Sequence, residues 1–323
     1  MSSTVYPYLS EEKLKIAEKE SAAKELSWLL GSFEETFLAL KNGVEECHAL
    51  FAPAHRGSTL VLSSPRSESI KGHITRLGSR IVKGTINLRL RTHAPLNLII
   101  SPASSDAETN LDGFSLPSLS TLCKLLDQSL ECLESTRFPV ADTGPEQTAT
   151  ALDLNSDSSH IFSQLRLLHS FFQESLLILK GSDLPPKSSS SDKKPHYAKA
   201  WHLEPLKSDL FTPELPSTLA LDISIRDCSL LLTIRVLEPC SQSPTLSSIF
   251  LTGIGAQRRL EHDEMNHEFL YCGEMVRVKE KCRIESSADP CLLSCAAKLQ
   301  VLERSVLGAM EALRIVLGCE EEE

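Results

Sequence analysis

Residues 26–51, LSWLLGSFEETFLALKNGVEECHALF, decide the fold class. Their apolar side chains recur at alternating intervals of four and three residues, which places them in one stripe along a helix with a seven-residue repeat. Charged residues such as Glu34, Glu35 and Lys41 lie between them and predict a solvated opposite face. Pro53 disfavours helical angles in the residue before it, so the helix is expected to span residues 10–52. The predicted core positions are Leu26, Leu30, Phe33, Phe37, Leu40 and Val44.

Three further segments have helical spacing. Leucines recur every three or four residues over 119–133, and apolar residues do so over 161–179. In the last segment, Asp289 is a predicted N-cap and Pro290 the predicted first helical residue, where a missing N–H costs little. A seven-residue repeat then gives the predicted core positions Leu292, Leu299, Val306 and Leu313.

Two other regions alternate between apolar and polar residues with the period of a half-buried β-strand. Residues 70–77 and 80–91 flank a turn signal at Gly78-Ser79, and residues 96–101 are expected to add a further short strand. A second hairpin is predicted over 219–237, and another strand pair near 260–272 and 275–285. Both regions are therefore expected to be antiparallel.

The combined pattern predicts an α+β fold. We expect an antiparallel helical bundle with coiled-coil-like heptads, formed by the N- and C-terminal helices, plus an inserted antiparallel β module. The bundle would comprise residues 10–52, 114–181 and 289–318, and the β module residues 58–101 and 216–286. Residues 182–200, rich in serine and containing Pro185-Pro186, are predicted to be a flexible linker. Four stripes can pack on one another within one chain, so a monomer is expected rather than a dimerising leucine zipper.

Composition narrows the class of protein. The chain has 323 residues and a net charge of −10, so phosphate backbones repel it and general nucleic-acid binding is not expected. Its 10 cysteines are scattered rather than arranged as a disulfide framework, which indicates reduced thiols and an intracellular protein. Neither a signal peptide nor an apolar run of about 20 residues is evident. Membrane contact is therefore expected to be peripheral at most, or through partners.

Basic residues are concentrated on two predicted strands. No acidic residue occurs between positions 69 and 105, although the chain as a whole is acidic. An outward basic face would suit an acidic partner or lipid headgroups. For the second strand, pairing with nearby residues such as Glu264 and Glu268 is the favoured alternative, whereas the first has no local acidic partner. The candidate partner-binding stripe is Lys83, Arg89, Arg91, Arg277, Lys279 and Lys281.

Catalytic and metal-binding motifs are not evident. His262, His267, Cys272 and Cys282 are close in sequence, but their spacing matches no zinc module. The glycines at 253 and 255 lack the remaining residues of a phosphate-binding loop. We therefore expect no metal, no cofactor and no enzymatic activity.

The order of these segments resembles the Rogdi family, also called leucine-zipper containing, whose fungal member is the small subunit of the RAVE complex. The resemblance extends over most of the chain. Its most specific part is FTPELPS at 211–217, leading into the hairpin of 219–237. It also includes ELSWLL at 25–30, Ile70-Lys71-Gly72, and GAQRRLE at 255–261.

The resemblance implies a non-catalytic scaffold that promotes assembly of the vacuolar-type proton-translocating ATPase. Implied partners are a large propeller-containing RAVE subunit, a Skp-type adaptor and the peripheral sector of the pump. The implied location is the cytoplasm, with recruitment to vacuolar or endosomal membranes. Two alternatives stay open: a self-associating coiled-coil adaptor unrelated to the pump, and an enzyme of unknown type.

Overall fold

The computed structural model describes residues 10–52, 57–64, 69–100, 113–136, 151–181, 201–240, 262, 264–265 and 267–318. The predicted linker 182–200, the glycines at 253 and 255, and residues 255–261 lie outside these ranges. The chain divides into two compact units. The helical unit comprises Met1–His48, Lys124–Leu176 and Ala297–Glu323, and the sheet unit comprises Ala49–Cys123 and Leu177–Ala296.

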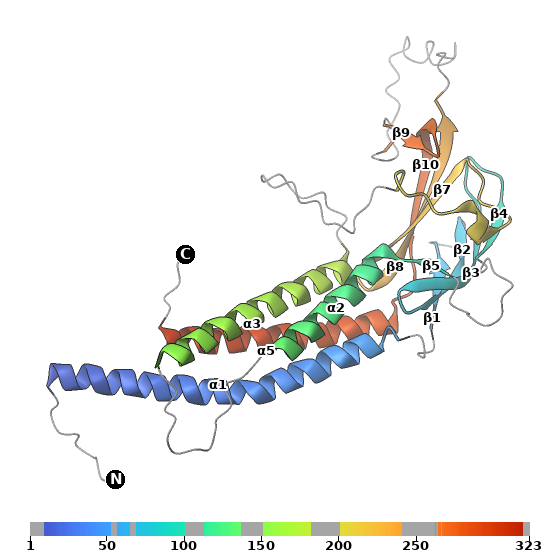
Figure 1. Cartoon of the computed structure of the whole chain (residues 1–323). Coiled ribbons are helices and arrows are strands. Elements are labelled where there is room, and N and C mark those ends of the chain that lie inside the picture. Colours follow the sequence, from blue (N-terminus) through green and yellow to red (C-terminus); the bar gives the residue numbers. More distant parts are fainter. Residues whose placement is uncertain are drawn as a thin grey trace. The chain divides into compact units, whose positions relative to one another are not determined.

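The described residues form an α+β fold with four α-helices and two antiparallel sheets (Figure 1). The helices are α1 (Glu11–Ala49), α2 (Pro117–Ser135), α3 (Ala151–Lys180) and α5 (Pro290–Leu317). The expected bundle of N- and C-terminal helices with one inserted β module is wrong, because strands separate the helices along the chain and form two sheets. Alternation predicts that a segment is a strand, but it does not specify which strand donates hydrogen bonds to which.

Segments of all four helices contribute to the helical unit. The stripe on α1 is buried, from Leu26 at 5% exposure to Val44 at 0%. On α5, Leu299, Val306 and Leu313 are also fully buried. Ion pairs join different helices on the surface, as between Lys41 Nζ and Glu134 Oε1 at 2.9 Å and between Lys298 and Glu46. The first turns of α1 extend past this packing, since residues 11–22 are all exposed.

The first sheet of the sheet unit has the strand order β1-β2-β3-β4-β6, with β5 paired to β3. Gly78 closes the β2–β3 hairpin at a φ of +59°, a backbone angle that glycine adopts without strain. One face is apolar and buried, whereas the other is exposed and mainly polar, with Val61 and Ile99 as exposed apolar side chains. The strands are β1 (Ser58–Ser63), β2 (Ile70–Leu77), β3 (Arg80–Leu88), β4 (Leu96–Ile100), β5 (Phe114–Ser115) and β6 (Phe211–Thr212).

The second sheet has the order β7-β8-β10-β9. The predicted hairpin over 219–237 is present as β7 and β8, and its turn residues Asp227 and Cys228 both have positive φ. Their backbone N–H groups donate to the carbonyls of Lys180 and Leu179 at 2.9 Å, which holds the turn against the end of α3. The strands are β7 (Leu219–Arg226), β8 (Ser229–Pro239), β9 (Glu268–Tyr271) and β10 (Glu274–Glu285).

The start of α5 confirms the predicted cap. Asp289 Oδ1 accepts a hydrogen bond from the backbone N–H of Cys291 at 2.9 Å, and Pro290 is the first helical residue. Because a carboxylate at an N-cap satisfies an otherwise unpaired donor, Asp289 stabilises this helix end. Leu292, in the first turn that follows, is fully buried.

Candidate functional site

The six residues of the predicted basic stripe do not share one environment. Lys83 lies on β3, and Arg89 and Arg91 follow that strand; all three are exposed. Arg277 and Lys279 are exposed on β10, whereas Lys281 on the same strand is not. The stripe therefore divides into a part on the first sheet and a part on the second.

The basic residues of β10 are largely engaged within the chain. The Arg277 guanidinium contacts Glu268 Oε1 at 2.5 Å across the β9–β10 pair. Lys281 Nζ contacts Glu264 Oε1 at 2.9 Å, and its side chain is only 4% exposed. A bulge between Val278 and Glu280 interrupts the pairing with β8. Such an insertion breaks the alternation of faces, so Lys281 does not continue the outward row that the sequence predicted.

Lys281 belongs to a buried charged cluster; its pairing with Glu264 is the alternative that the sequence favoured for this strand, but the participation of Arg235 was not predicted. Glu264 also accepts from Arg235 on β8, whose Nε lies 2.6 Å from Oε2. Burial raises the pKa of Glu264, but the hydrogen bonds from Arg235 and Lys281 outweigh it and leave that pKa below its ordinary value. Trp201 lies 4.6 Å from the Arg235 guanidinium, ring centroid to carbon, and covers it. Nearby, burial raises the pKa of Asp222. Glu264 pairs with both cations, although Arg235 Nη1 is buried without a hydrogen-bond partner in the described structure. The paired charges indicate a structural role.

Arg91 lies beside an acidic group from the second sheet. Glu280 accepts hydrogen bonds from the backbone N–H groups of Arg91 at 3.2 Å and Thr92 at 2.9 Å, and from the Thr92 hydroxyl at 2.7 Å. Burial raises the pKa of Glu280, but these hydrogen bonds and the charge of Arg91 together lower it below the ordinary range. The contact joins the loop after β3 to β10. Arg91 therefore already has a carboxylate close to it within the chain.

Lys71, Lys83 and Arg89 form what we call the basic face, on the exposed side of the first sheet. Within the described ranges, none of the three is within ion-pair distance of a carboxylate. Strand register places Lys71 opposite Asn87, and Asn87 opposite Asn97, in one row across β2, β3 and β4. Lys71 was visible in the sequence as a basic residue of the acid-free segment, but only the register places it beside β3.

A groove of about 580 Å³ lies at one end of the basic face. Arg89 contributes to its wall, and its backbone N–H donates to the Ser69 carbonyl at 2.7 Å, which fixes the chain there. The groove is shallow and open to solvent, because most of its lining side chains are exposed. The lining residues are Ser69, Ile70, Lys71, Asn87, Leu88, Arg89, Pro95, Leu96 and Asn97.

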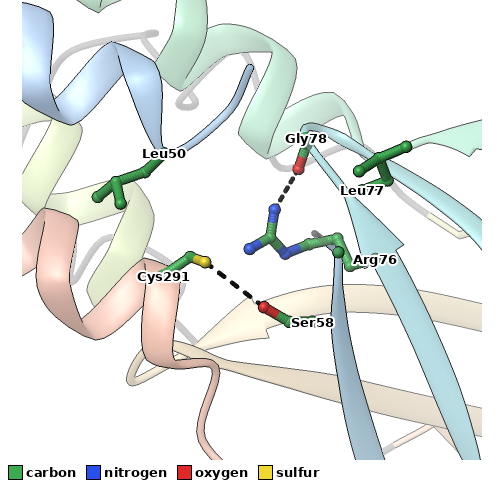
Figure 2. Close-up of a pocket in the computed structure, with 7 residues that line it drawn as sticks. Leu50, Ser58, Arg76, Leu77, Gly78 and Cys291 are labelled. Atoms are coloured by element: carbon green, nitrogen blue, oxygen red, sulfur yellow. Dashed lines mark hydrogen bonds between the residues drawn. The ribbon is translucent and has the colours of Figure 1, made fainter. Parts of the chain in front are cut away.

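Arg76, another basic residue of the acid-free segment, is buried. Together with Asp289, Ser58 and Gly78 it forms a cluster that we call the arginine lock. Its Nε lies 2.6 Å from Asp289 Oδ2, and the two side chains are 2% and 0% exposed. The guanidinium also donates to the Gly78 carbonyl (Figure 2). It lies 5.8 Å from the Phe51 ring centroid. The Ser58 hydroxyl donates to Asp289 Oδ1 at 2.9 Å.

The arginine lock has the properties of a structural joint rather than of a ligand site. The space among its side chains is too small for a water molecule. Figure 2 shows Arg76 directed from β2 toward the Gly78 carbonyl, with Ser58 and Cys291 close by. Because Asp289 is also the N-cap of α5, one carboxylate joins two strands of the first sheet to this helix end. Removing one partner of such a buried ion pair strongly destabilises the folded protein, because the other charge is left buried and unpaired.

In the described ranges, no group of three or more histidine, cysteine, aspartate or glutamate side chains is arranged to hold a metal ion. His262, Cys272 and Cys282 accordingly belong to no such group. No helix among the described residues combines the length and apolar character needed to cross a membrane.

Comparison with known proteins gives the family. The sequence model of the family described as "Rogdi leucine zipper containing protein" matches residues 25–314. The chain belongs to the Rogdi family. A curated relative from Schizosaccharomyces pombe, named "Regulator of V-ATPase in vacuolar membrane protein 2", is 25% identical over 302 residues. The match covers 88% of this chain and 90% of the relative. Residues 25–314 of this Rogdi family member include the arginine lock, the basic face and the groove.

Proposed function

We propose that the protein is a non-catalytic scaffold that regulates the vacuolar-type proton-translocating ATPase and promotes its assembly. The observation that carries the proposal is the match over nearly the full length of a relative named as a regulator of the V-ATPase. Membership of the Rogdi family supports the same role. In this role the protein acts by holding other subunits in position rather than by converting a substrate.

The proposed partners are a large propeller-containing RAVE subunit, a Skp-type adaptor and the peripheral sector of the pump. The protein would work in the cytoplasm and reach vacuolar or endosomal membranes through these partners. Lys71, Lys83 and Arg89 are the proposed docking residues, because cations without acidic neighbours gain most from an acidic counter-surface. Arg91, Arg277 and Lys281 contribute less in this proposal, since each is already close to a carboxylate.

Affinity purification tests the proposal. The full chain, tagged and expressed near its natural level, should recover subunits of the pump's peripheral sector and a propeller-containing protein. A matched double charge reversal at exposed positions of α1, Lys13→Glu with Lys19→Glu, should recover the same set, whereas the pair Lys83→Glu and Arg89→Glu should recover less. Recovery of neither pump subunits nor a propeller-containing protein would contradict the scaffold role. Recovery of the chain with a second copy alone would favour a self-associating adaptor.

A further inference from the structure

The groove presents donors from three strands toward one space. Lys71 comes from β2, Asn87 from β3 and Asn97 from β4, and the antiparallel register aligns them in one row. Arg89 lies two residues beyond Asn87 and lines the same groove. Because three paired strands hold these side chains, their spacing is set by the sheet rather than by a loop.

The chemistry of this set favours an anionic ligand. Lys71 and Arg89 are full positive charges, and in the described part of the chain neither forms an ion pair with a carboxylate. No acidic residue occurs from position 69 to position 105. Cations that donate hydrogen bonds to a carboxylate or phosphate make the strongest contacts of this kind. A ligand that carries negative charge could therefore pair with both cations.

The side-chain amides of Asn87 and Asn97 favour one class of anionic ligand over another. A side-chain amide carries both donors and an acceptor, so it is fully used only by a ligand that offers both kinds of group. An extended peptide backbone offers an N–H and a C=O at each residue, whereas a phosphate offers acceptors alone. Pro95 and Leu96 add apolar surface to the same wall, which suits a polypeptide better than a headgroup.

We propose that this groove binds an extended acidic segment of a partner protein. A ligand carboxylate would lie between Lys71 and Arg89, and the backbone beside it would exchange hydrogen bonds with Asn87 and Asn97. The inference rests on the proposed docking function and adds the chemistry of the partner. It assigns Lys71, Asn87 and Asn97 to binding, none of which is in the stripe predicted from sequence.

Fluorescence anisotropy with the purified full chain tests this assignment. The probe is a labelled peptide of alternating glutamate and serine, compared with its glutamine counterpart and with phosphatidylserine vesicles. The acidic peptide should bind at least tenfold more tightly than the glutamine peptide. Raised salt should weaken its binding, because the contacts are solvent-accessible charges.

Variants separate recognition from general charge attraction. Lys71→Glu with Arg89→Glu should weaken binding at least tenfold, while Lys13→Glu with Lys19→Glu, an equal charge change at exposed positions of α1, should leave it unchanged. Asn97→Leu should weaken binding while the dependence on salt stays as in the wild type. Unchanged circular dichroism would establish that each variant is folded, as expected for exposed positions.

Three results would overturn the assignment: equal affinity for the two peptides, equal binding by the wild type and the double variant, or binding to vesicles but not to the acidic peptide. The outcome is independent of the purification experiment. Peptide binding without recovery of pump subunits would support the groove as a peptide site and contradict the scaffold role. Recovery of pump subunits without peptide binding would support the scaffold role and contradict the groove as a peptide site.

Discussion

Asp289→Asn is the substitution that the arginine lock predicts to be most informative. Asparagine is as good an N-cap as aspartate, so the start of α5 keeps its hydrogen bond to Cys291. What is lost is the charge that neutralises Arg76, whose side chain is 2% exposed. Removing one partner of a buried ion pair costs about 3–5 kcal/mol, a large part of the 5–15 kcal/mol that typically stabilises a domain.

The sheet unit can be followed by the fluorescence of Trp201 during unfolding in guanidinium chloride, in a Trp28→Phe background. Trp28 is 75% exposed in the helical unit, so this replacement is expected to be nearly silent. Asp289→Asn should lower the free energy of unfolding by about 3 kcal/mol or more. Asp289→Ala should cost about 1 kcal/mol beyond that, because the cap is also lost.

A double-mutant cycle provides the control. Arg76→Met combined with Asp289→Asn removes both charges, so the double variant should be more stable than Asp289→Asn alone. Glu268→Gln, at the exposed pair with Arg277, should cost less than about 1 kcal/mol. A loss below about 1 kcal/mol for Asp289→Asn would refute the reasoning, because Arg76 would then not depend on that carboxylate.

Three further predictions concern other parts of the chain. Phe37→Asp should unfold the helical unit, since its side chain is buried and an unpaired buried charge costs several kcal/mol, whereas Glu45→Asp should leave the helical circular dichroism unchanged. Glu280→Gln should lower stability at pH 7, and the loss should shrink as the pH falls. The pKa of Glu280 is lowered in the folded chain, so its contribution is present above its unfolded pKa and is lost as pH falls through the folded one. A difference in denaturation midpoint that stays constant as the pH is lowered would contradict this. Gly31→Ala should raise stability by about 0.5–1 kcal/mol, because no atom lies within 4 Å of the added methyl group in the described structure. Gly181→Ala should lower stability, since φ is +67° and the methyl group would lie 2.1 Å from the Ile225 carbonyl oxygen. Equal effects of the two substitutions on the thermal unfolding temperature would contradict the surroundings assigned to these glycines.

Local periodicity predicted the elements well because each depends on neighbouring residues. The seven-residue repeat from Leu26 to Val44 coincides with the buried side of α1, and alternation around Gly78-Ser79 coincides with the β2–β3 hairpin. The arrangement of strands into two sheets depends on hydrogen bonds between distant segments, as in the pairing of β4 with β6, and periodicity carries no such information. For that reason the bundle with a single inserted module was wrong.

The candidate site was predictable only in part. Absence of acidic residues between 69 and 105 indicated a basic surface, and Lys83 and Arg89 are exposed. Arg76 belongs to the same acid-free segment, but its buried partner is 213 positions away at Asp289. Lys281 was assigned to an outward row, because a one-residue bulge cannot be seen in a pattern of period two.

The central claim is that the protein regulates the vacuolar-type proton pump by acting as a scaffold, and pump assembly in cells tests it most directly. The measurement is the fraction of the pump's peripheral sector that sediments with vacuolar or endosomal membranes in cells lacking the protein. Our account predicts that this fraction falls, that wild-type protein restores it, and that Lys83→Glu with Arg89→Glu restores it only partly. An unchanged fraction in cells lacking the protein would contradict the claim.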